Sequence, residues 1–325
     1  MRSVLLLLFL GLLISGDSLA SEAEAEAAYK IRVATLAPRQ SPIGVEYQKV
    51  KIGLREATNG QVSLQMYYGG VAGDERSVVG KMRVGQLDGA LITSAGLGAV
   101  VRQVLVLQAP GLITSYPELA EVRAALGPEF EALFLKAGYE LIAWGDAGRI
   151  RMFSKHKIRE PNDLRQARPW AWRDSPPMQA VLRAAGANGV LLALPEVYSA
   201  LQTGMIDTVI ASSIAVMAFQ WHTKLKTMAK QSSGIVVGAF IIKSEKMDSL
   251  PPEAQAFLRD SVLELNSRET DDEATEKLRE RLKVTNLGAY GNAWKAVQYQ
   301  ARWDLAGRLY SRALLERVGD IVGRQ

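Results

Sequence analysis

One stretch, residues 163–207, constrains the fold more than any other part of the sequence. It alternates strand-like and helix-like pieces, and its last third carries the most specific pattern. Pro195 and Glu196 suit the first turn of a helix, where a missing amide and a negative charge are both tolerated. Apolar residues then recur at helical spacing until Gly204, a residue suited to ending a helix. A strand over residues 206–211 follows, so the segment predicts a strand, a helix and a further strand in succession.

The N-terminal part of the sequence repeats this alternation. Strands are expected over residues 29–35, 61–67 and 87–93, and helices over residues 44–58 and 75–84. Strands that alternate with helices predict a mainly parallel sheet covered by helices. A chain of 325 residues has room for two such domains.

The first 20 residues have the pattern of a secretory signal peptide. Arg2 precedes an apolar run over residues 4–14, and small residues at 18–20 suit a cleavage site. The alternative is an uncleaved membrane anchor, which would need about 20 apolar residues. No later segment has the length and hydropathy to cross a membrane, so we expect a soluble mature protein in the periplasm.

The composition excludes several classes of site. The chain has no cysteine, which rules out disulfides, thiolate zinc sites and cysteine nucleophiles. Its formal net charge of +5 is modest, so nucleic-acid binding is not expected. The two histidines, His156 and His222, lie in no zinc-protease motif, and no nucleophile-elbow motif occurs. We therefore expect no enzyme, no cofactor and no metal.

Two patterns admit a ligand-binding interpretation and a simpler one. The glycine turn at residues 69–73 precedes a helix, as in phosphate-binding loops, but it lacks the lysine and hydroxyl residue of a P-loop. Glycines that permit unusual backbone angles explain it better. The acidic cluster at residues 269–273 lacks the glycine turn of a calcium loop. A solvated helix face is the preferred interpretation there.

The motifs, taken together, match a known family. The run Glu-Val-Tyr-Ser-Ala-Leu-Gln-Thr-Gly at 196–204, the Ile-Asp pair at 206–207 and the glycine turn at 69–73 occur in the order seen there. The chain resembles the substrate-binding subunits of tripartite ATP-independent periplasmic (TRAP) transporters over nearly all of its mature length. The resemblance implies a two-lobed α/β fold of the periplasmic-binding-protein type, with hinge strands and long C-terminal helices. It also implies a small-molecule ligand and a TRAP-type membrane permease as partner.

The resemblance divides the chain into segments. Lobe I is expected at residues 29–147 and 233–265, and lobe II at residues 148–232. Residues 266–325 are expected to form C-terminal helices that pack across both lobes. One helix is expected to begin at the prolines before Glu253 and to run past Leu282. A monomer is the default expectation.

The sequence departs from the family at the residue that matters most for the ligand. Family members carry a ligand-binding arginine on a strand whose counterpart here holds Trp170, or Ala171 if the following Ser-Pro sets the register. An arginine grips a carboxylate through two charge-assisted bonds, and losing them would weaken binding by roughly 10- to 10⁴-fold. A second family arginine corresponds to Arg149 or Arg151, and the spacing to Ile158 favours Arg149.

Two interpretations of the ligand follow. Arg149, Arg168 or Arg173 anchors an acid while tryptophans stack on its body, or an aromatic pocket accepts a bulkier and less polar molecule. Simple core packing is the alternative role for Trp170 and Trp172. The expected ligand-binding residues are Arg149, Arg151, Trp170, Trp172, Arg173, Thr93, Ser94, Ser212 and Trp221. The predicted function is capture of a small organic ligand by lobe closure and delivery to the permease; the alternative is service to an efflux, lipid-handling or sensory system.

Overall fold

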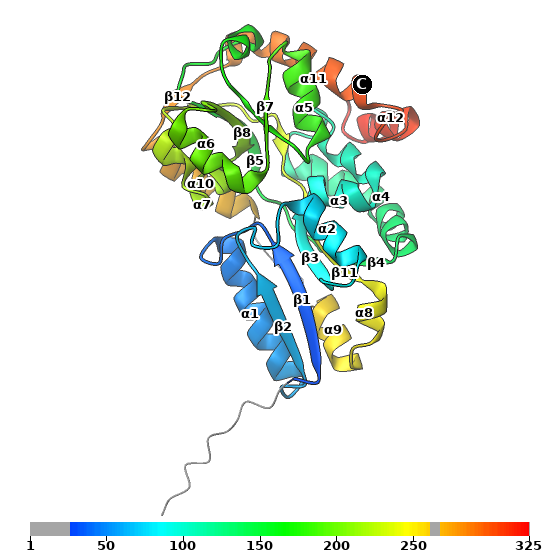
Figure 1. Cartoon of the computed structure of the whole chain (residues 1–325). Helices are drawn as coiled ribbons and strands as arrows, with labels where there is room; N and C mark the ends of the chain where they lie inside the picture. The colour runs from blue at the N-terminus through cyan, green and yellow to red at the C-terminus, as the bar shows by residue number, and fades with distance from the viewer. Residues whose placement is uncertain (1–26, 261–266, 325) are drawn as a thin grey trace, which may run out of the picture.

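The computed structural model of the chain describes residues 27–260 and 267–324, with side chains described from residue 269 in the second part. The predicted signal peptide lies outside these residues. Within them, no helix is long and apolar enough to cross a membrane. Two lobes, each built on its own sheet, lie one above the other in Figure 1.

Lobe I, the lower one, is built on a sheet with the strand order β2-β1-β3-β11-β4. These strands are β1 (Tyr29–Thr35), β2 (Val62–Tyr67), β3 (Gly89–Thr93), β4 (Tyr139–Trp144) and β11 (Gly238–Lys243). β1 pairs in parallel with β2 and β3, as the alternation of strands and helices predicts. β11 is antiparallel to both β3 and β4, because it enters lobe I from the other lobe.

Helices cover both faces of this sheet. One face carries α1 (Pro42–Ala57), α8 (Ser244–Asp248) and α9 (Pro252–Asp260), packed on a core that includes Ile31, Leu54 and Phe240. The other face carries α2 (Glu75–Arg83), α3 (Ser94–Val100), η1 (Arg102–Gln108), α4 (Tyr116–Lys136) and α12 (Arg312–Ile321). Ser115 begins α4 with a capping box, and its hydroxyl accepts a hydrogen bond from the amide of Glu118.

Lobe II is built on a second sheet and a short strand pair. The sheet contains β5 (Arg149–Ser154), β8 (Thr208–Ser212), β9 (Thr227–Ala229), β10 (Gly234–Ile235) and β12 (Lys283–Thr285). β6 (Trp170–Trp172) and β7 (Val190–Leu192) pair in parallel beside it. The helices of this lobe are η2 (Pro161–Arg165), α5 (Pro176–Ala184), η3 (Leu194–Glu196), α6 (Val197–Thr203), α7 (Ser213–Ala218), η4 (Trp221–Lys224), α10 (Ser267–Arg279), η5 (Gly288–Tyr290) and α11 (Gly291–Leu305).

The most specific sequence motif folds as its residues predict. Pro195 lies in η3, the short helical turn that leads into α6. Gly204 follows the last residue of α6 as its C-cap, and its φ of 77° is the left-handed conformation that favours glycine. β8 begins at Thr208, two residues later than expected. Asp207 lies between α6 and β8, and its backbone amide donates to the carbonyl of Arg168.

Two chain segments run side by side between the lobes. The amide of Gly145 donates to the carbonyl of Gly238 at 2.8 Å, and the amide of Ala147 to that of Val236 at 2.7 Å. The amide of Val236 returns a bond to the carbonyl of Gly148. These extended segments join β4 to β5 and β10 to β11, which is the arrangement of hinge strands between two closing lobes.

The C-terminal part differs from expectation at one place. The expected helix through Leu282 ends at Arg279, because residues 283–285 form β12 and pair in parallel with β9. Beyond it, α11 packs on α5 of lobe II, whereas α12 packs on α4 and η1 of lobe I. Figure 1 shows both helices along one side of the molecule.

Candidate functional site

A cavity of about 1330 Å³ lies between the lobes. Its walls come from the ends of β1 and β3, the hinge segments, β5, β6 and α7, and part of it reaches α11. Most of the wall is apolar, and the exceptions include two arginines of β5 and a buried glutamate. Among the nine expected ligand-binding residues, seven line this cavity: Thr93, Arg149, Arg151, Trp170, Trp172, Ser212 and Trp221.

Arg151 is a buried charged residue of the cavity wall whose Nε atom has no hydrogen-bond partner. Its exposed fraction is 5%. No hydrogen bond or ion pair joins the Arg151 side chain to any described residue. Burial lowers the pKa of its guanidinium below the ordinary value, although nearby Asp271 opposes the shift. A buried cation without a partner is costly, so this position favours an anion from the cavity.

Arg149, the residue that the spacing favours, is held by carboxylates of α10. Its Nε donates to Asp271 at 2.7 Å, and its Nη2 donates to Asp272. The ring of Tyr116 lies 5.9 Å from the guanidinium carbon. Two acidic partners neutralise this arginine, so it is less suited to binding a further anion than Arg151.

The expected solvated face of the acidic cluster is wrong for Asp271. Its side chain is fully buried, with Oδ2 bound to Arg149 and Oδ1 without a hydrogen-bond partner. Adjacent residues on a helix usually diverge, but the long arginine side chain meets Asp271 and Asp272 together. Within the described parts of the chain, no cluster of His, Cys, Asp or Glu side chains is arranged to hold a metal ion.

The tryptophans form one aromatic wall. Trp170 stacks on Trp172 with ring centroids 5.8 Å apart, and it meets the edge of Trp221 at 5.5 Å. Phe219 stacks on Trp221, with ring centroids 5.3 Å apart. The indole nitrogen of Trp170 donates to the carbonyl of Leu192 at 3.1 Å. Packing on one another therefore uses most of the ring surface, and the remaining surface lines the cavity.

Trp170 and Ala171, the two possible counterparts of the family arginine, face opposite sides of β6. Trp170 lines the cavity, whereas Ala171 packs against Gly189 and Leu182. Strand geometry explains the difference, since successive side chains alternate between faces. The side of β6 that faces the cavity thus carries an indole at one of the two positions where the family resemblance implies an arginine.

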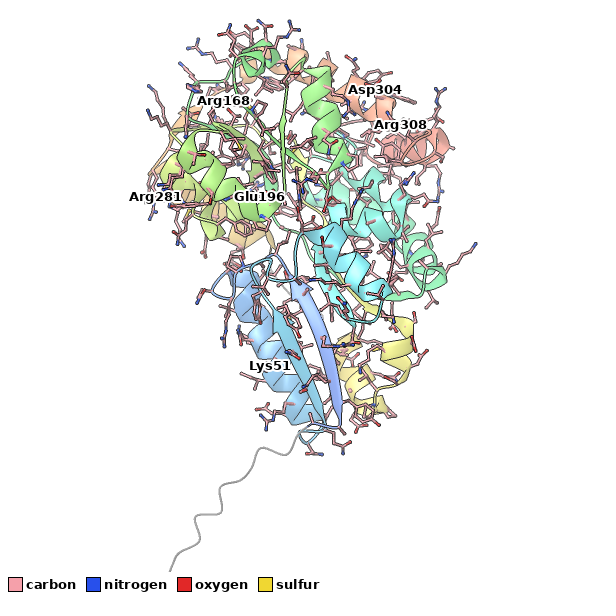
Figure 2. The ribbon with its side chains drawn as sticks, in the orientation of Figure 1. Lys51, Arg168, Glu196, Arg281, Asp304 and Arg308 are labelled. Carbon is pink, nitrogen blue, oxygen red and sulfur yellow. The ribbon has the colours of Figure 1, made fainter. Side chains whose placement is uncertain are left out.

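The other two arginines near this strand lie outside the cavity. Arg168 is about 59% exposed at its side chain and binds Asp207. Arg173 is 58% exposed, and its guanidinium lies 3.5 Å from Glu196. Figure 2 shows Arg168 well above the junction of the lobes and Glu196 closer to it. Neither arginine is placed to replace the missing cation.

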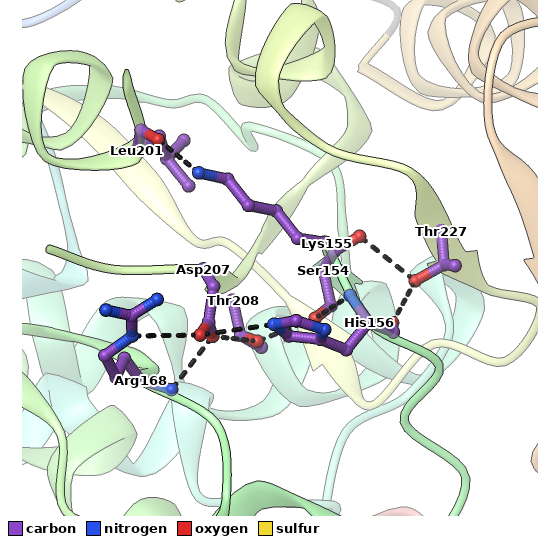
Figure 3. Close-up of polar contacts among 8 residues, drawn as sticks. All are labelled: Ser154, Lys155, His156, Arg168, Leu201, Asp207, Thr208 and Thr227. Carbon is purple, nitrogen blue, oxygen red and sulfur yellow. Dashed lines mark hydrogen bonds and ion pairs between the residues drawn. The ribbon is translucent and has the colours of Figure 1, made fainter. Parts of the chain in front are cut away.

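Asp207 is the centre of a structural network, which Figure 3 shows. Its carboxylate accepts from the backbone amide of Arg168 at 2.8 Å, from the Arg168 Nε at 3.2 Å and from the Thr208 hydroxyl at 3.0 Å, with His156 Nε2 3.5 Å away. Burial opposes its ionisation, yet these bonds hold its pKa below the ordinary value. Since the bonds join the residues before β6 to β8, the family motif here fixes the position of β6.

The three small hydroxyl residues have different roles. Thr93 lines the cavity, and its hydroxyl donates to the carboxylate of Glu75 at 2.9 Å. Ser212 lines it too and caps α7, accepting from the amide of Ala215 at 3.2 Å. Ser94 is buried beside the cavity and donates to the side chain of Gln108. Of these three, Thr93 and Ser212 are placed to meet a ligand.

Glu75 and Gln108 line the cavity although the sequence did not suggest them. Glu75 is 1% exposed and accepts from the Thr93 amide at 2.8 Å, the Thr93 hydroxyl and the Gly96 amide at 2.7 Å. Burial raises its pKa to about 7, against the effect of these bonds. The only sequence signal was an acid in the first turn of a predicted helix, which capping explains equally well.

A family model covers most of the chain. The family described as bacterial extracellular solute-binding protein, family 7, matches residues 33–291. The chain belongs to this family. It is a family of solute-binding receptors, and it includes the substrate-binding subunits of TRAP transporters, as the sequence motifs predicted.

Relatives of known sequence are distant. A solute-binding protein of Albidiferax ferrireducens is 26% identical over 210 residues, 63% of this chain and 61% of that protein. A solute-binding protein of Chromohalobacter salexigens is 24% identical over 172 residues, 52% of this chain and 51% of that protein. The 2,3-diketo-L-gulonate-binding periplasmic protein YiaO of Escherichia coli is 24% identical over 216 residues, 65% of each chain. The matched segments thus span between about half and two thirds of these relatives.

Solved structures confirm the two-lobed α/β fold. A Bordetella pertussis extracytoplasmic solute receptor binding pyroglutamic acid has a TM-score of 0.81 at 18% identity, covering 91% of this chain and 99% of its own. A TRAP periplasmic solute-binding protein from Desulfovibrio salexigens, with bound orotic acid, has a TM-score of 0.80 at 21% identity with the same coverage. At these identities the likeness extends to the fold.

Proposed function

We propose that the protein is a periplasmic receptor that captures an organic acid between its lobes and delivers it to a TRAP-type membrane permease. The observation that carries the proposal is Arg151, a buried guanidinium that lines the interlobe cavity without a partner among the described residues. A carboxylate satisfies such a group through two parallel charge-assisted bonds. Arg151 therefore takes over the role of the arginine that the family carries on the strand of Trp170.

The cavity suggests an acid with a sizeable apolar body. Its volume of about 1330 Å³ exceeds the usual range of ligand sites, which is roughly 300–1,000 Å³. Trp172, Trp221 and Phe219 supply an aromatic part of the cavity wall. Three similar proteins, named above for 2,3-diketo-L-gulonate, pyroglutamic acid and orotic acid, bind acids smaller than this volume admits. Their ligands support the acid group, and the aromatic wall supports the larger body.

Family membership supports the rest of the proposal. The signal-peptide pattern at residues 1–20 directs export to the periplasm. The hinge segments at residues 145–148 and 234–238 allow the lobes to open for ligand entry and to close around it. The closed form is then the one presented to the permease, since ligand binding shifts the population toward it.

A second candidate function is specifically favoured by the indole at the position of the family arginine. A wall built from Trp170, Trp172 and Trp221 suits an uncharged apolar ligand, and such a ligand fits an efflux, lipid-handling or sensory system better than carboxylate uptake. In that case Arg151 would pair with solvent or with polar groups of the ligand. The two candidates differ in whether the ligand must carry a negative charge.

The test uses acids paired with their uncharged amides. Purified mature protein, unfolded and refolded to remove co-purified ligand, is screened by thermal shift against aromatic and aliphatic carboxylates and the matching primary amides. The acids are expected to raise the melting temperature and the amides are not. Arg151→Ala is expected to weaken binding of a hit by roughly 10- to 10⁴-fold in calorimetry. Arg173→Ala, which removes an exposed arginine outside the cavity, is the matched control and should leave affinity unchanged. Equal binding of an acid by parent and Arg151→Ala proteins would refute the proposed role.

A further inference from the structure

The N-terminus of α2 forms a direct contact between the lobes. Asp74 precedes this helix in lobe I, and its Oδ2 accepts from the indole nitrogen of Trp172 at 2.9 Å and from the amide of Leu194 at 3.1 Å. Both donors belong to lobe II. Asp74 also caps α2 by accepting from the amide of Glu75 at 3.0 Å. One carboxylate thus joins a helix of lobe I to strand β6 and to the first residue of η3 in lobe II.

A second carboxylate makes the reciprocal contact. Asp174 of lobe II accepts from the backbone amide of Arg76 at 3.0 Å, and the Arg76 side chain lies 3.7 Å from its other oxygen. Asp174 is buried, whereas the Arg76 side chain is mostly exposed. The amide of Arg76 is one of the first in α2, so a negative charge from lobe II lies at the positive end of a lobe I helix.

The glycine turn before α2 completes the contact. A Cβ atom added at Gly70 would lie 3.0 Å from the Cγ of Pro195 in lobe II, so the backbone of the turn approaches that ring closely. The φ of Gly70 is 78°, a conformation that favours glycine. The turn at residues 69–73 therefore serves close approach between the lobes, at a place where a larger residue would hold them apart. Figure 1 shows α2 where the two lobes meet.

We propose that Asp74 and Asp174 form a latch that holds the lobes closed and thereby sets how long a ligand stays in the cavity. Hydrogen bonds to carboxylates are stronger than those between neutral groups, and here three such bonds must break when the lobes separate. None of the three involves a ligand atom. Asp74 and Asp174 do not line the cavity, so they are positioning residues that act on closure. Trp172 links the two roles, because its ring lines the cavity while its nitrogen binds Asp74.

The inference goes beyond the proposed function and can be tested without a known ligand. The sequence has no cysteine, so Lys51→Cys on α1 and Gln202→Cys on α6 place one spin label on an exposed position of each lobe. Distance distributions from pulsed electron resonance on the ligand-stripped mature protein then give the ratio of closed to open forms. This measurement does not depend on finding a ligand in the thermal-shift screen. Conversely, a result that overturns the latch does not affect the proposed role of Arg151.

The variants separate the latch from helix capping. Asp74→Ser retains a good helix cap with a side chain too short for Trp172, and Trp172→Phe retains the ring without the indole nitrogen. We expect Asp74→Ser and Asp174→Ala each to lower the closed-to-open ratio about tenfold or more, and Trp172→Phe to lower it less. Asp163→Ser removes a capping carboxylate whose bonds stay within lobe II and should leave the distribution unchanged.

The hydrogen bond between Asp74 and Trp172 implies that the effects of substituting the two residues do not add. Once Asp74→Ser is present, adding Trp172→Phe should change the closed-to-open ratio little further, because the bond is already lost. The inference is overturned if the distance distributions of Asp74→Ser, Asp174→Ala and their double variant superimpose on that of the parent. It is equally overturned if the ligand-stripped parent shows only the open distance.

Discussion

Replacing Glu75 by glutamine should change how the stability of this protein depends on pH. Glu75 is a fully buried carboxyl in the wall of the cavity, and burial raises its pKa from 4.5 to about 7. Three hydrogen bonds from Thr93 and Gly96 favour its charged form but do not offset the loss of water. A neighbouring carboxylate, Asp74, adds to the rise.

The sign and size of the effect follow from proton binding. In the unfolded chain Glu75 loses its proton near pH 4.5, whereas the folded protein keeps it until about pH 7. Between these values the folded state binds more protons, so the free energy of unfolding falls as the pH rises. A rise of about 2.5 pKa units at 1.36 kcal/mol each amounts to about 3 kcal/mol. The penalty is absent below pH 4.5 and complete above about pH 8.

Denaturant unfolding of parent and Glu75→Gln proteins from pH 4.5 to pH 8.5 measures this difference. The variant has no proton to lose, so its stability relative to the parent should rise by about 3 kcal/mol across that range. Glu121→Gln, at an exposed position of α4, is the matched control and should track the parent at every pH. A constant difference between parent and Glu75→Gln across the range would show that the buried carboxyl does not titrate near pH 7.

Two further predictions concern the hinge. Gly148→Ala should lower the free energy of unfolding by roughly 1–3 kcal/mol and lower the melting temperature measured by circular dichroism, because φ is 97° and the new Cβ would lie 2.7 Å from Asp271. The control, Gly80→Ala, adds a Cβ in open space on α2 and should be neutral or stabilising. Equal melting temperatures of the two variants would contradict the predicted strain at Gly148. Asp271→Ala should lower the free energy of unfolding by roughly 1–3 kcal/mol in denaturant unfolding, less than the full cost of breaking a buried pair, because a second carboxylate still binds Arg149. Glu273→Ala, which breaks an exposed pair, should cost less than about 1 kcal/mol, and a similar loss for both would refute the difference in burial.

The order of elements was predictable because it depends on local patterns. Alternation over residues 29–35 and 61–67, and a helix that starts at proline and stops at Gly204, are properties of neighbouring residues. β12 was not predictable, since three residues become a strand only by pairing with β9, more than 50 residues earlier. The expected helix through Leu282 was wrong for the same reason, as pairing with a distant strand overrode local propensity.

Most of the expected ligand-binding residues line the cavity, but their contacts could not be predicted from the sequence. Arg149 and Arg151 lie two apart on one strand, so their side chains share a face, and only the spacing to Ile158 favoured Arg149. Their ranking comes from Asp271 and Asp272, which lie some 120 residues away and neutralise Arg149. The buried position of Asp271 was hidden in a run of charged residues that, taken alone, is typical of an exposed helix.

The contacts of Trp170 and Trp172 also could not be predicted from the sequence. Core packing and ligand contact were treated as alternatives for Trp170 and Trp172. The structure shows that the two rings pack on one another and also line the cavity, so core packing does not exclude ligand contact. The bond from Trp172 to Asp74 joins residues 98 apart in the sequence. No local pattern could have indicated it.

Native mass spectrometry of the mature protein, with identification of whatever co-purifies, tests the central claim most directly. The account predicts a bound acid with an apolar body in the parent and in Arg173→Ala, and its loss from Arg151→Ala. An uncharged molecule retained equally by the parent and Arg151→Ala would contradict the account, because the buried guanidinium would then have no part in binding the ligand.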